Sequence, residues 1–267
     1  HVHAHIVRVF GMAWAPYSLE QLGVGDDAVG LGGQVGEQLV FDGRDVQGLA
    51  AIAFAIALRA ALHRTAGKVH GDGAELDDGC GFGAGYALAA AQLSFVAALA
   101  LYDALTDACG PAARLAIKWP NDVLLNGGKV AGILLESGGV GASVLAVAIG
   151  IGVNLAAAPD MAAVEPGAVT PVSVRTETGH VVPPDEFLDL LAVAFARWQA
   201  QLETYGFAPI RTAWLARAAK LGEPIVARTG GTERHGIFEG IDDSGALLLK
   251  TSSGRQVIPA ADVYFTG

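Results

Sequence analysis

The amino-acid sequence predicts an α/β protein, of the α+β kind, in which a mixed β-sheet flanked by helices is followed by a small β-barrel. Three observations carry this prediction. An apolar run of helical length, residues 87–109, precedes several short apolar runs that are separated by turn residues. The longest of these short runs, residues 143–154, is rich in β-branched residues, as in a central buried strand. Short strand patterns separated by glycine-containing turns then fill the chain from residue 222 onward.

The first half of the chain contains few clear elements. Residues 49–62 form an apolar run, which predicts one helix. Residues 87–109 predict a longer, buried helix, which ends at Gly110 and Pro111 because glycine caps helices and proline cannot continue them. Residues 115–118 then predict a short strand.

The middle of the chain predicts a hairpin and a central strand. Asn126-Gly127 separates the apolar runs 123–125 and 129–136, and Asn-Gly between such runs is a strong hairpin signal. Residues 143–154 predict the central strand, and residues 156–182 predict a loop.

Two helices and five strands complete the prediction. Residues 183–205 predict a helix with Asp185 as its N-cap, and residues 209–221 predict a second helix. The five predicted strands of the barrel cover residues 225–228, 236–241, 246–250, 256–258 and 263–265.

Composition and charge exclude several classes of partner. The net charge of −10 gives the chain no general attraction to nucleic acid. The mean hydropathy of +0.42 comes from short Ala and Val runs, all shorter than the roughly 20 residues that span a bilayer, so we expect no membrane association. Cys80 and Cys109 match neither a metal site nor a disulfide framework, which favours a reducing, cytoplasmic location.

The residues after the strand 115–118 carry the strongest chemical signal. Lys118 stands at the strand end beside the rigid Trp119-Pro120 step, where a lysine can point into a cleft, and Trp119 itself is expected to pack rather than bind a ligand. Asn121 and Asp122 keep the following backbone bent. Gly132 would let a ligand approach the backbone closely. On these grounds alone, a plain strand–turn–hairpin with an exposed lysine remains an alternative.

The segment KWPNDVLLNGGKVAGILLE resembles the central motif of the biotin protein ligases. IGIGVN, residues 149–154, is similar to the glycine-and-asparagine strand end of that family, and residues 236–265 resemble its small SH3-like terminal domain. The likeness covers about residues 92–265. It implies a biotin/lipoate ligase-like catalytic domain over residues 86–221 and an SH3-like barrel over residues 222–267.

The resemblance also implies a reaction in two steps. The carboxylate of biotin attacks the α-phosphate of ATP, with Mg²⁺, to give biotinyl-5′-AMP. A lysine of the biotin carboxyl carrier domain of a biotin-dependent carboxylase then attacks this mixed anhydride. Carried over by motif, Lys118 is the cation at the activated carbonyl and the α-phosphate. A carboxylate that attacks a polyphosphate needs such fixed positive charge.

Further site residues follow from the same motif. Gly132 and Ile133 would line the biotin pocket through their backbone. Lys129 would contact phosphate, or else be a solvated hairpin lysine. Asn154 would face the nucleotide phosphates or their Mg²⁺, or else start a turn. Asn121 would contact the adenylate or only brace the turn, and the protein itself is expected to carry no metal site of its own.

Residues 1–85 depart from the family pattern. They hold 16 of the 36 glycines, and the Gly-Arg-rich phosphate loop of the family is missing from them. The nearest candidate, residues 64–73, is followed by further acids at Glu75, Asp77 and Asp78 where the family has arginines. Two interpretations stay open: this segment is translated in a wrong frame, which the lack of a first Met also fits, or the protein is a divergent or inactive relative.

Two other functions remain possible at this stage. A lipoate–protein ligase shares the catalytic fold, and a non-catalytic binder could retain the fold without the phosphate loop. No helix-turn-helix pattern is recognisable, so a repressor role is not expected. The sequence leaves open whether the protein is a monomer or a homodimer.

Overall fold

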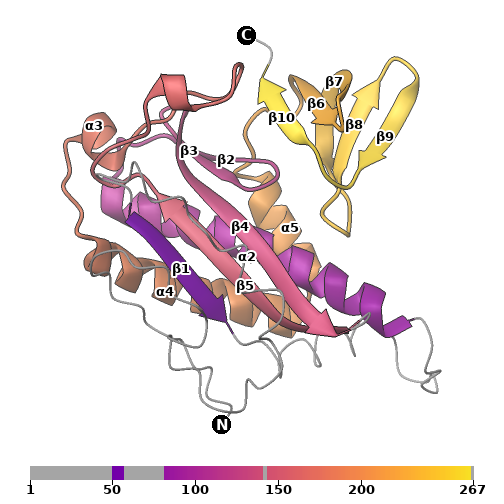
Figure 1. Ribbon diagram of the computed structural model, residues 1–267, viewed down its shortest axis with the longest axis horizontal. Helices are drawn as coiled ribbons and strands as arrows, with labels where there is room; N and C mark the ends of the chain where they lie inside the picture. Colours follow the sequence, from indigo (N-terminus) through magenta and orange to yellow (C-terminus); the bar gives the residue numbers. More distant parts are fainter. Residues whose placement is uncertain (1–49, 57–80, 141–142, 266–267) are drawn as a thin grey trace.

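The computed structural model describes residues 50–56, 81–140 and 143–265, which form two antiparallel sheets and the helices that join them (Figure 1). The predicted α+β class is confirmed, but the prediction of a mixed sheet is wrong for the described strands, because each is paired antiparallel with its neighbour. The first sheet has the strand order β1-β5-β4-β3-β2, with every neighbouring pair antiparallel. Its strands are β1 (Ala50–Ile56), β2 (Leu115–Lys118), β3 (Asp122–Leu125), β4 (Gly128–Val140) and β5 (Ser143–Val153).

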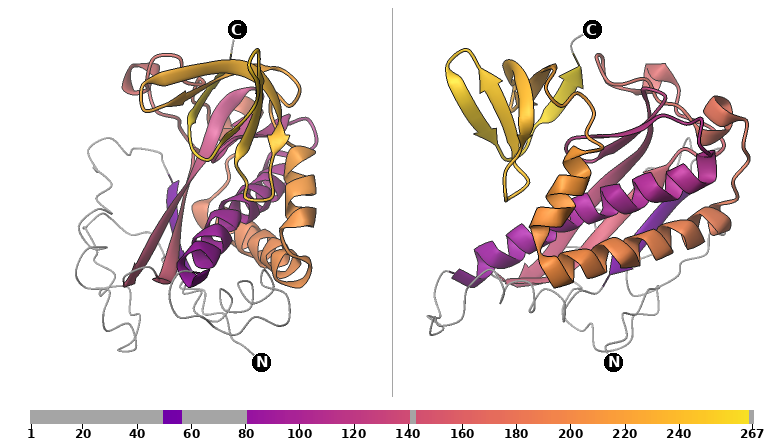
Figure 2. Two further views of the ribbon diagram at one scale, coloured as in Figure 1. Left: turned by 90° about the vertical axis from the view of Figure 1, so that its right-hand side faces the viewer. Right: turned by 180° about the vertical axis from the view of Figure 1, so that it is seen from behind.

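Two long helices cover one face of this sheet. Helix α2 (Gly81–Cys109) and helix α4 (Pro184–Tyr205) lie side by side there (Figure 2). Helix α2 packs against the sheet and against α4, and its residues Val96–Leu101 are fully buried. The helix predicted over residues 87–109 is confirmed and begins earlier, at Gly81.

The expected cap of α4 is wrong. Pro183 occupies the N-cap position and Pro184 begins the helix, while Asp185 lies in the first turn, and no side chain caps the helix end. Proline is favoured at the first helical position because its fixed φ suits the helix and its missing N–H would have no partner there.

The helix predicted over residues 49–62 is also wrong where the structure describes it. Residues 50–56 form strand β1, which pairs with β5 from Ala50 opposite Val153 to Ile56 opposite Val147. The sequence AAIAFAI alternates small and large residues with a period of two, which suits a strand as well as an apolar run suits a helix. Pairing with the backbone of β5 decides between the two.

The second sheet contains all five strands that the sequence predicts. Its strand order is β10-β6-β7-β8-β9, again antiparallel throughout, so β10 and β9 lie at its two ends (Figure 2). The strands are β6 (Pro224–Thr229), β7 (Thr232–Ile241), β8 (Leu247–Thr251), β9 (Gly254–Ile258) and β10 (Asp262–Phe265).

Short elements connect the two sheets. The predicted loop over residues 156–182 contains the 3-10 turn η3 (Met161–Ala163) and the short helix α3 (Val174–Thr178). Helix α5 (Phe207–Leu215) starts two residues before the predicted start at residue 209 and ends six residues before the predicted end at residue 221. The chain after α5 then pairs with β2, where Ile117 N donates to Arg217 O and Ile117 O accepts from Ala219 N. This pairing covers the outer edge of β2.

Aromatic side chains join the two sheets through one core. Phe95 of α2 meets Phe207 and Trp214 of α5 edge to face, with ring centroids 5.2 and 5.5 Å apart. Trp214 in turn meets Phe238 of β7 at 6.5 Å. The buried residues of the terminal sheet therefore belong to the same hydrophobic cluster as those of the first sheet.

Among the helices of residues 81–140 and 143–265, none combines the length and hydropathy of a membrane-crossing helix. The interpretation of residues 1–85 as a frame-shifted or divergent segment falls almost entirely outside the described residues and stays a prediction. The same holds for the candidate loop at residues 64–73.

We expect Phe95→Ala to lower the free energy of unfolding by about 3–5 kcal/mol, because the rings around it cannot fill the space left behind. Val193→Ala is the matched control on α4: Val193 is 74% exposed, and its loss should change stability by less than about 0.5 kcal/mol. Denaturant unfolding followed by tryptophan fluorescence measures both. Equal effects of the two substitutions would contradict the shared aromatic core.

Candidate functional site

One row of residues crosses all five strands of the first sheet. Lys118 of β2 pairs with Asp122 of β3, which pairs with Gly132 of β4, which pairs with Gly152 of β5. Ala51 of β1 completes the row opposite Gly152. Residues directly opposite each other in an antiparallel sheet lie on the same face, so the register brings a lysine, a carboxylate and two glycines together.

This row lies on the face that α2 and α4 do not cover. The neighbouring row contains Ile117, Val123, Ala131 and Val153, all of them buried in the core. Since successive side chains in a strand point to opposite faces, the row of Lys118 points away from these helices. Leu134, two residues beyond Gly132 on the same face, is 49% exposed.

Asp122 holds the ammonium groups of two lysines. Lys118 Nζ donates to Asp122 Oδ2 at 3.1 Å, and Lys129 Nζ forms an ion pair with Oδ1 at 2.6 Å. The Asp122 side chain is 9% exposed, that of Lys118 is 10% exposed and that of Lys129 is 42% exposed. Two ammonium groups on one carboxylate leave a net positive charge, and Lys129 presents it outward.

A β-bulge aims Lys129 at this cluster. The pairing of β3 with β4 shifts register between Val123 and Leu124, so that Val130 is the extra residue on β4. Val130 and Ala131 are both buried. Without the extra residue Lys129 would alternate onto the helix-covered face with Ala131; with it, the lysine reaches Asp122 on the other face.

Asn121 fixes the turn to strand β4. Its side-chain Nδ2 donates to Ile133 O at 2.7 Å, and its backbone carbonyl accepts from Ile133 N at 2.9 Å. The side chain of Ile133 is buried, opposite Ile151. The structure therefore brings Asn121 and Ile133 next to the cluster, where Asn121 braces the turn.

Asn154 follows strand β5 and also has a bracing role. Its side-chain Nδ2 donates to Val172 O at 2.9 Å and to Lys129 O at 3.4 Å. The backbone of Lys129 is bonded on both sides of this contact, from Lys129 N to Thr170 O and from Val172 N to Lys129 O. Asn154 thus ties the start of β4 to residues 170–172.

The terminal sheet reaches the site at two places. The ring of Phe265 lies 6.0 Å from Lys118 Nζ, within range of a cation–π interaction. Tyr264, beside it on β10, donates its hydroxyl hydrogen to Glu165 Oε2 at 3.1 Å and stacks against the Arg228 guanidinium at 4.3 Å. Strand β10 therefore contacts both the lysine cluster and the loop that leads to residues 170–172.

Trp119 packs as expected and has a further contact that the sequence did not indicate. It is 3% exposed, its bond to Pro120 is cis, and its indole Nε1 donates to Gly245 O of the terminal sheet at 3.0 Å. Within residues 81–140 and 143–265, no group of three or more His, Cys, Asp or Glu side chains forms a metal site. The arrangement suits an anionic ligand beside a bare strip of backbone.

Residues 85–154 match the model of the biotin/lipoate A/B protein ligase family, and residues 220–266 match that of the biotin protein ligase C terminal domain. Over 183 residues the chain is 81% identical to the biotin–[acetyl-CoA-carboxylase] ligase of Paracoccus denitrificans, which covers 68% of this chain and 76% of that protein. This chain belongs to the biotin protein ligase family.

Other members of the biotin protein ligase family are more distant. The bifunctional ligase/repressor BirA of Bacillus subtilis is 34% identical over 172 residues, which cover 64% of this chain and 52% of that protein. This chain therefore matches about half the length of that relative. The crystal structure of the biotin protein ligase from Aquifex aeolicus superposes with a TM-score of 0.60 over 82% of this chain and 83% of that one. At 18% identity this likeness concerns the fold.

We expect Asp122→Asn to destabilise the protein by about 3 kcal/mol, because it leaves the buried Lys118 and its neighbour Lys129 facing each other without a counter-charge. Glu223→Gln is the control: it breaks the pair of Glu223 with Lys220, whose side chains are 54% and 36% exposed, and should cost under about 1 kcal/mol. Denaturant midpoints report the two losses. If both variants lose the same stability, the cluster has no special buried charge balance.

Proposed function

We propose that this protein is an ATP-dependent ligase that activates biotin as biotinyl-5′-AMP and transfers it to a lysine of a biotin carboxyl carrier domain. The observation that carries the proposal is the row of Lys118, Asp122, Gly132 and Gly152, with Lys129 beside it. Membership of the family and the name of the 81% identical relative support the same reaction.

The lysine cluster fits the first step. When the biotin carboxylate attacks the α-phosphate of ATP, two negatively charged groups must approach and pyrophosphate must leave. Positive charge fixed beforehand at that point stabilises the transition state without reorganisation. Lys129, with 42% of its side chain exposed, would contact the reacting oxygens. Lys118, with 10% exposed, adds its charge from behind Asp122.

The glycine strip fits the apolar body of biotin. Among the described residues, a Cβ built on Gly152 meets no atom within 4 Å, and one on Gly132 meets Lys129 Nζ at 3.5 Å and Asp122 Oδ1 at 3.6 Å. A ligand ring can therefore lie against the backbone at these positions, with its carboxylate directed to Lys129. The backbone of Ile133, next to Gly132, completes this wall.

The second step uses the same charge. The amine of the acceptor lysine attacks the carbonyl of biotinyl-5′-AMP, an amide bond forms, the acyl C–O bond of the mixed anhydride breaks, and AMP leaves with the electron pair on its phosphate oxygen. Lys129 stabilises the departing phosphate, as it stabilised the attack in the first step. The amine must lose a proton for the reaction to finish, and the described residues assign no base to this transfer.

Mg²⁺ would arrive with the nucleotide. The described residues hold no cluster of metal-ligating side chains, so the phosphates of ATP would supply much of its coordination, and the metal would neutralise their charge. Asn154 uses its Nδ2 to hold Val172 O, which leaves its Oδ1 to meet the nucleotide or its metal. We propose a cytoplasmic enzyme, monomeric or homodimeric.

A lipoate–protein ligase is the second candidate, because one family model describes both biotin and lipoate ligases. The match of residues 220–266 to the biotin protein ligase C terminal domain favours biotin. Pyrophosphate exchange into ATP separates the candidates: exchange that depends on biotin supports the proposal, and exchange that depends on lipoate supports the second candidate. Biotin binding without exchange would identify a non-catalytic relative.

We expect Lys129→Ala and Lys118→Ala to reduce the rate of biotin-dependent exchange by about 10²–10³-fold, since each removes preorganised charge from the reacting groups. Lys250→Ala, at an exposed position on β8, should leave the rate unchanged. Circular dichroism checks that each variant is folded. Full activity in a folded Lys129→Ala protein would show that Lys129 has no role in the reaction.

We expect a graded loss of biotin affinity from Gly152→Ala to Gly152→Val. Within the described part of the chain the added methyl group meets no atom within 4 Å, so the melting temperature should stay near that of the unchanged protein. The added side chains occupy the ligand's place, however, and the larger should raise the KM for biotin by about tenfold or more. Steady-state exchange kinetics measure the effect. An unchanged KM in both variants would place biotin elsewhere.

A further inference from the structure

Besides the ring of Phe265 on β10, the β7–β8 turn, residues 242–246, contacts the lysine-bearing turn. We propose that the β7–β8 turn holds Lys118 and Asp122 in position through the indole of Trp119, which makes Trp119 a positioning residue for the ligase reaction. The inference rests on the proposed function, because the reaction is what the positioning serves.

The contact between Trp119 and the turn is buried and specific. Trp119 Nε1 donates to Gly245 O at 3.0 Å, across 126 positions of sequence, and both residues are buried. Gly245 has a φ of +87°, and a Cβ built there would lie 2.5 Å from Cε2 and 2.7 Å from Cζ of Phe95. Only glycine lets the turn come this close to the aromatic core and still present its carbonyl to Trp119.

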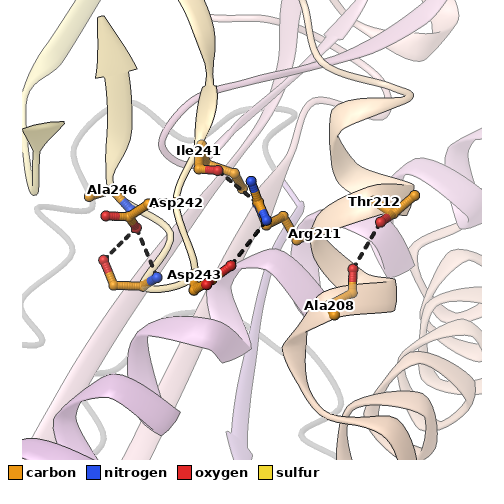
Figure 3. A network of polar contacts seen from close by, with 8 residues as sticks. Ala208, Arg211, Thr212, Ile241, Asp242, Asp243 and Ala246 are labelled. Carbon is orange, nitrogen blue, oxygen red and sulfur yellow. Dashed lines mark hydrogen bonds and ion pairs between the residues drawn. The ribbon is translucent and has the colours of Figure 1, made fainter. Parts of the chain in front are cut away.

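The turn is also held rigidly from its own side (Figure 3). Asp242 Oδ1 accepts hydrogen bonds from Ser244 N at 2.8 Å, Ser244 Oγ at 2.6 Å and Ala246 N at 3.0 Å. Burial alone would raise the pKa of Asp242, but these hydrogen bonds lower it overall. Arg211 of α5 then ties the turn to the helix: its Nε donates to Ile241 O at 2.7 Å and its Nη1 to Asp243 Oδ1 at 3.0 Å.

These contacts place a rigid support beside the site. Lys118 directly precedes Trp119 in the chain, and the pair of Lys118 with Asp122 spans the turn that Trp119 begins. Asn121 fixes the other side of that turn to Ile133. The indole bond therefore sets where the backbone of this turn lies, and with it the position of the carboxylate that both lysines share. A shift of such groups by about 1 Å is enough to slow a reaction strongly.

Trp119→Phe tests the inference, because phenylalanine keeps an aromatic ring and removes the N–H donor. Trp198→Phe is the matched control: Trp198 Nε1 donates to Asp103 Oδ2 at 2.7 Å, between α4 and α2, on the helix-covered face of the sheet and thus opposite the lysine row. Both variants lose one indole hydrogen bond. We expect Trp119→Phe to lower the kcat of biotin-dependent exchange by about tenfold, with the KM for biotin within about twofold. Trp198→Phe should keep the kcat of the unchanged protein.

Gly245→Ala supplies a second variant that acts on the same contact from the other side. Its added Cβ would also meet the Phe95 ring at 2.5 Å, so Gly245→Ala displaces the carbonyl and disturbs the aromatic core together. It should lower kcat, and the double variant with Trp119→Phe should have a kcat close to that of Gly245→Ala alone, because Gly245→Ala already displaces the carbonyl that Trp119 binds. Losses that multiply in the double variant, or a kcat for Trp119→Phe equal to that for Trp198→Phe, would overturn the inference.

Hydrogen exchange separates this inference from the proposed function. Measured on the full chain without substrates, the amides of residues 118–123 should exchange faster in Trp119→Phe than in Trp198→Phe. If the unchanged protein shows no biotin-dependent exchange of pyrophosphate into ATP, the proposed function fails. Faster hydrogen exchange of these amides in Trp119→Phe would still support the role of the turn. Equal protection of these amides in both variants would overturn that role whatever the activity.

Discussion

The carboxylate of Asp122 is the group on which the site depends. It is buried at the pairing of β2 with β3, and each of its oxygens lies against the ammonium of a different lysine. A buried carboxylate is unfavourable unless charge and hydrogen bonds compensate it, and the same holds for the buried Lys118. The three groups are therefore stable only together. Their sum is one net positive charge, and Lys129, with 42% of its side chain exposed, is the more accessible of the two lysines.

The sheet turns this local charge balance into a binding surface. Its register places Gly132 and Gly152 in the same row as Asp122, so among the described residues the cation is bordered by partly buried backbone without side chains. The bulge at Val130 is needed as well, because regular alternation would send Lys129 into the core beside Ala131. The candidate site on this antiparallel sheet thus depends on the bulge at Val130 and on the two glycines, Gly132 and Gly152.

The terminal sheet shares its hydrophobic core with the first sheet and its helices. Phe95, Trp214 and Phe238 link it to the long helices by edge-to-face contacts, while Trp119 and Phe265 link it to the lysines. A displacement of the terminal sheet would disturb both sets of contacts. This accounts for the presence of a small sheet beside a site whose charged groups all belong to the first one.

The sequence by itself determined most of the elements, because hairpin turns, glycine caps and apolar runs are local signals: α2, β2 to β5, α4 and all five terminal strands lie where these signals predict them. The motif around Lys118 also indicated the family and the neighbourhood of the site. Strand β1 could not be predicted from local sequence, because AAIAFAI fits a helix and a strand equally well. Only the hydrogen-bonded pairing with β5 decides for the strand. Lys129 lies on the same face as Lys118 because of a bulge, and it is the more exposed of the two lysines. No local sequence pattern indicates the bulge or the exposure. The bond from Trp119 to Gly245 joins residues 126 positions apart, and only tertiary packing could bring that donor and that carbonyl together.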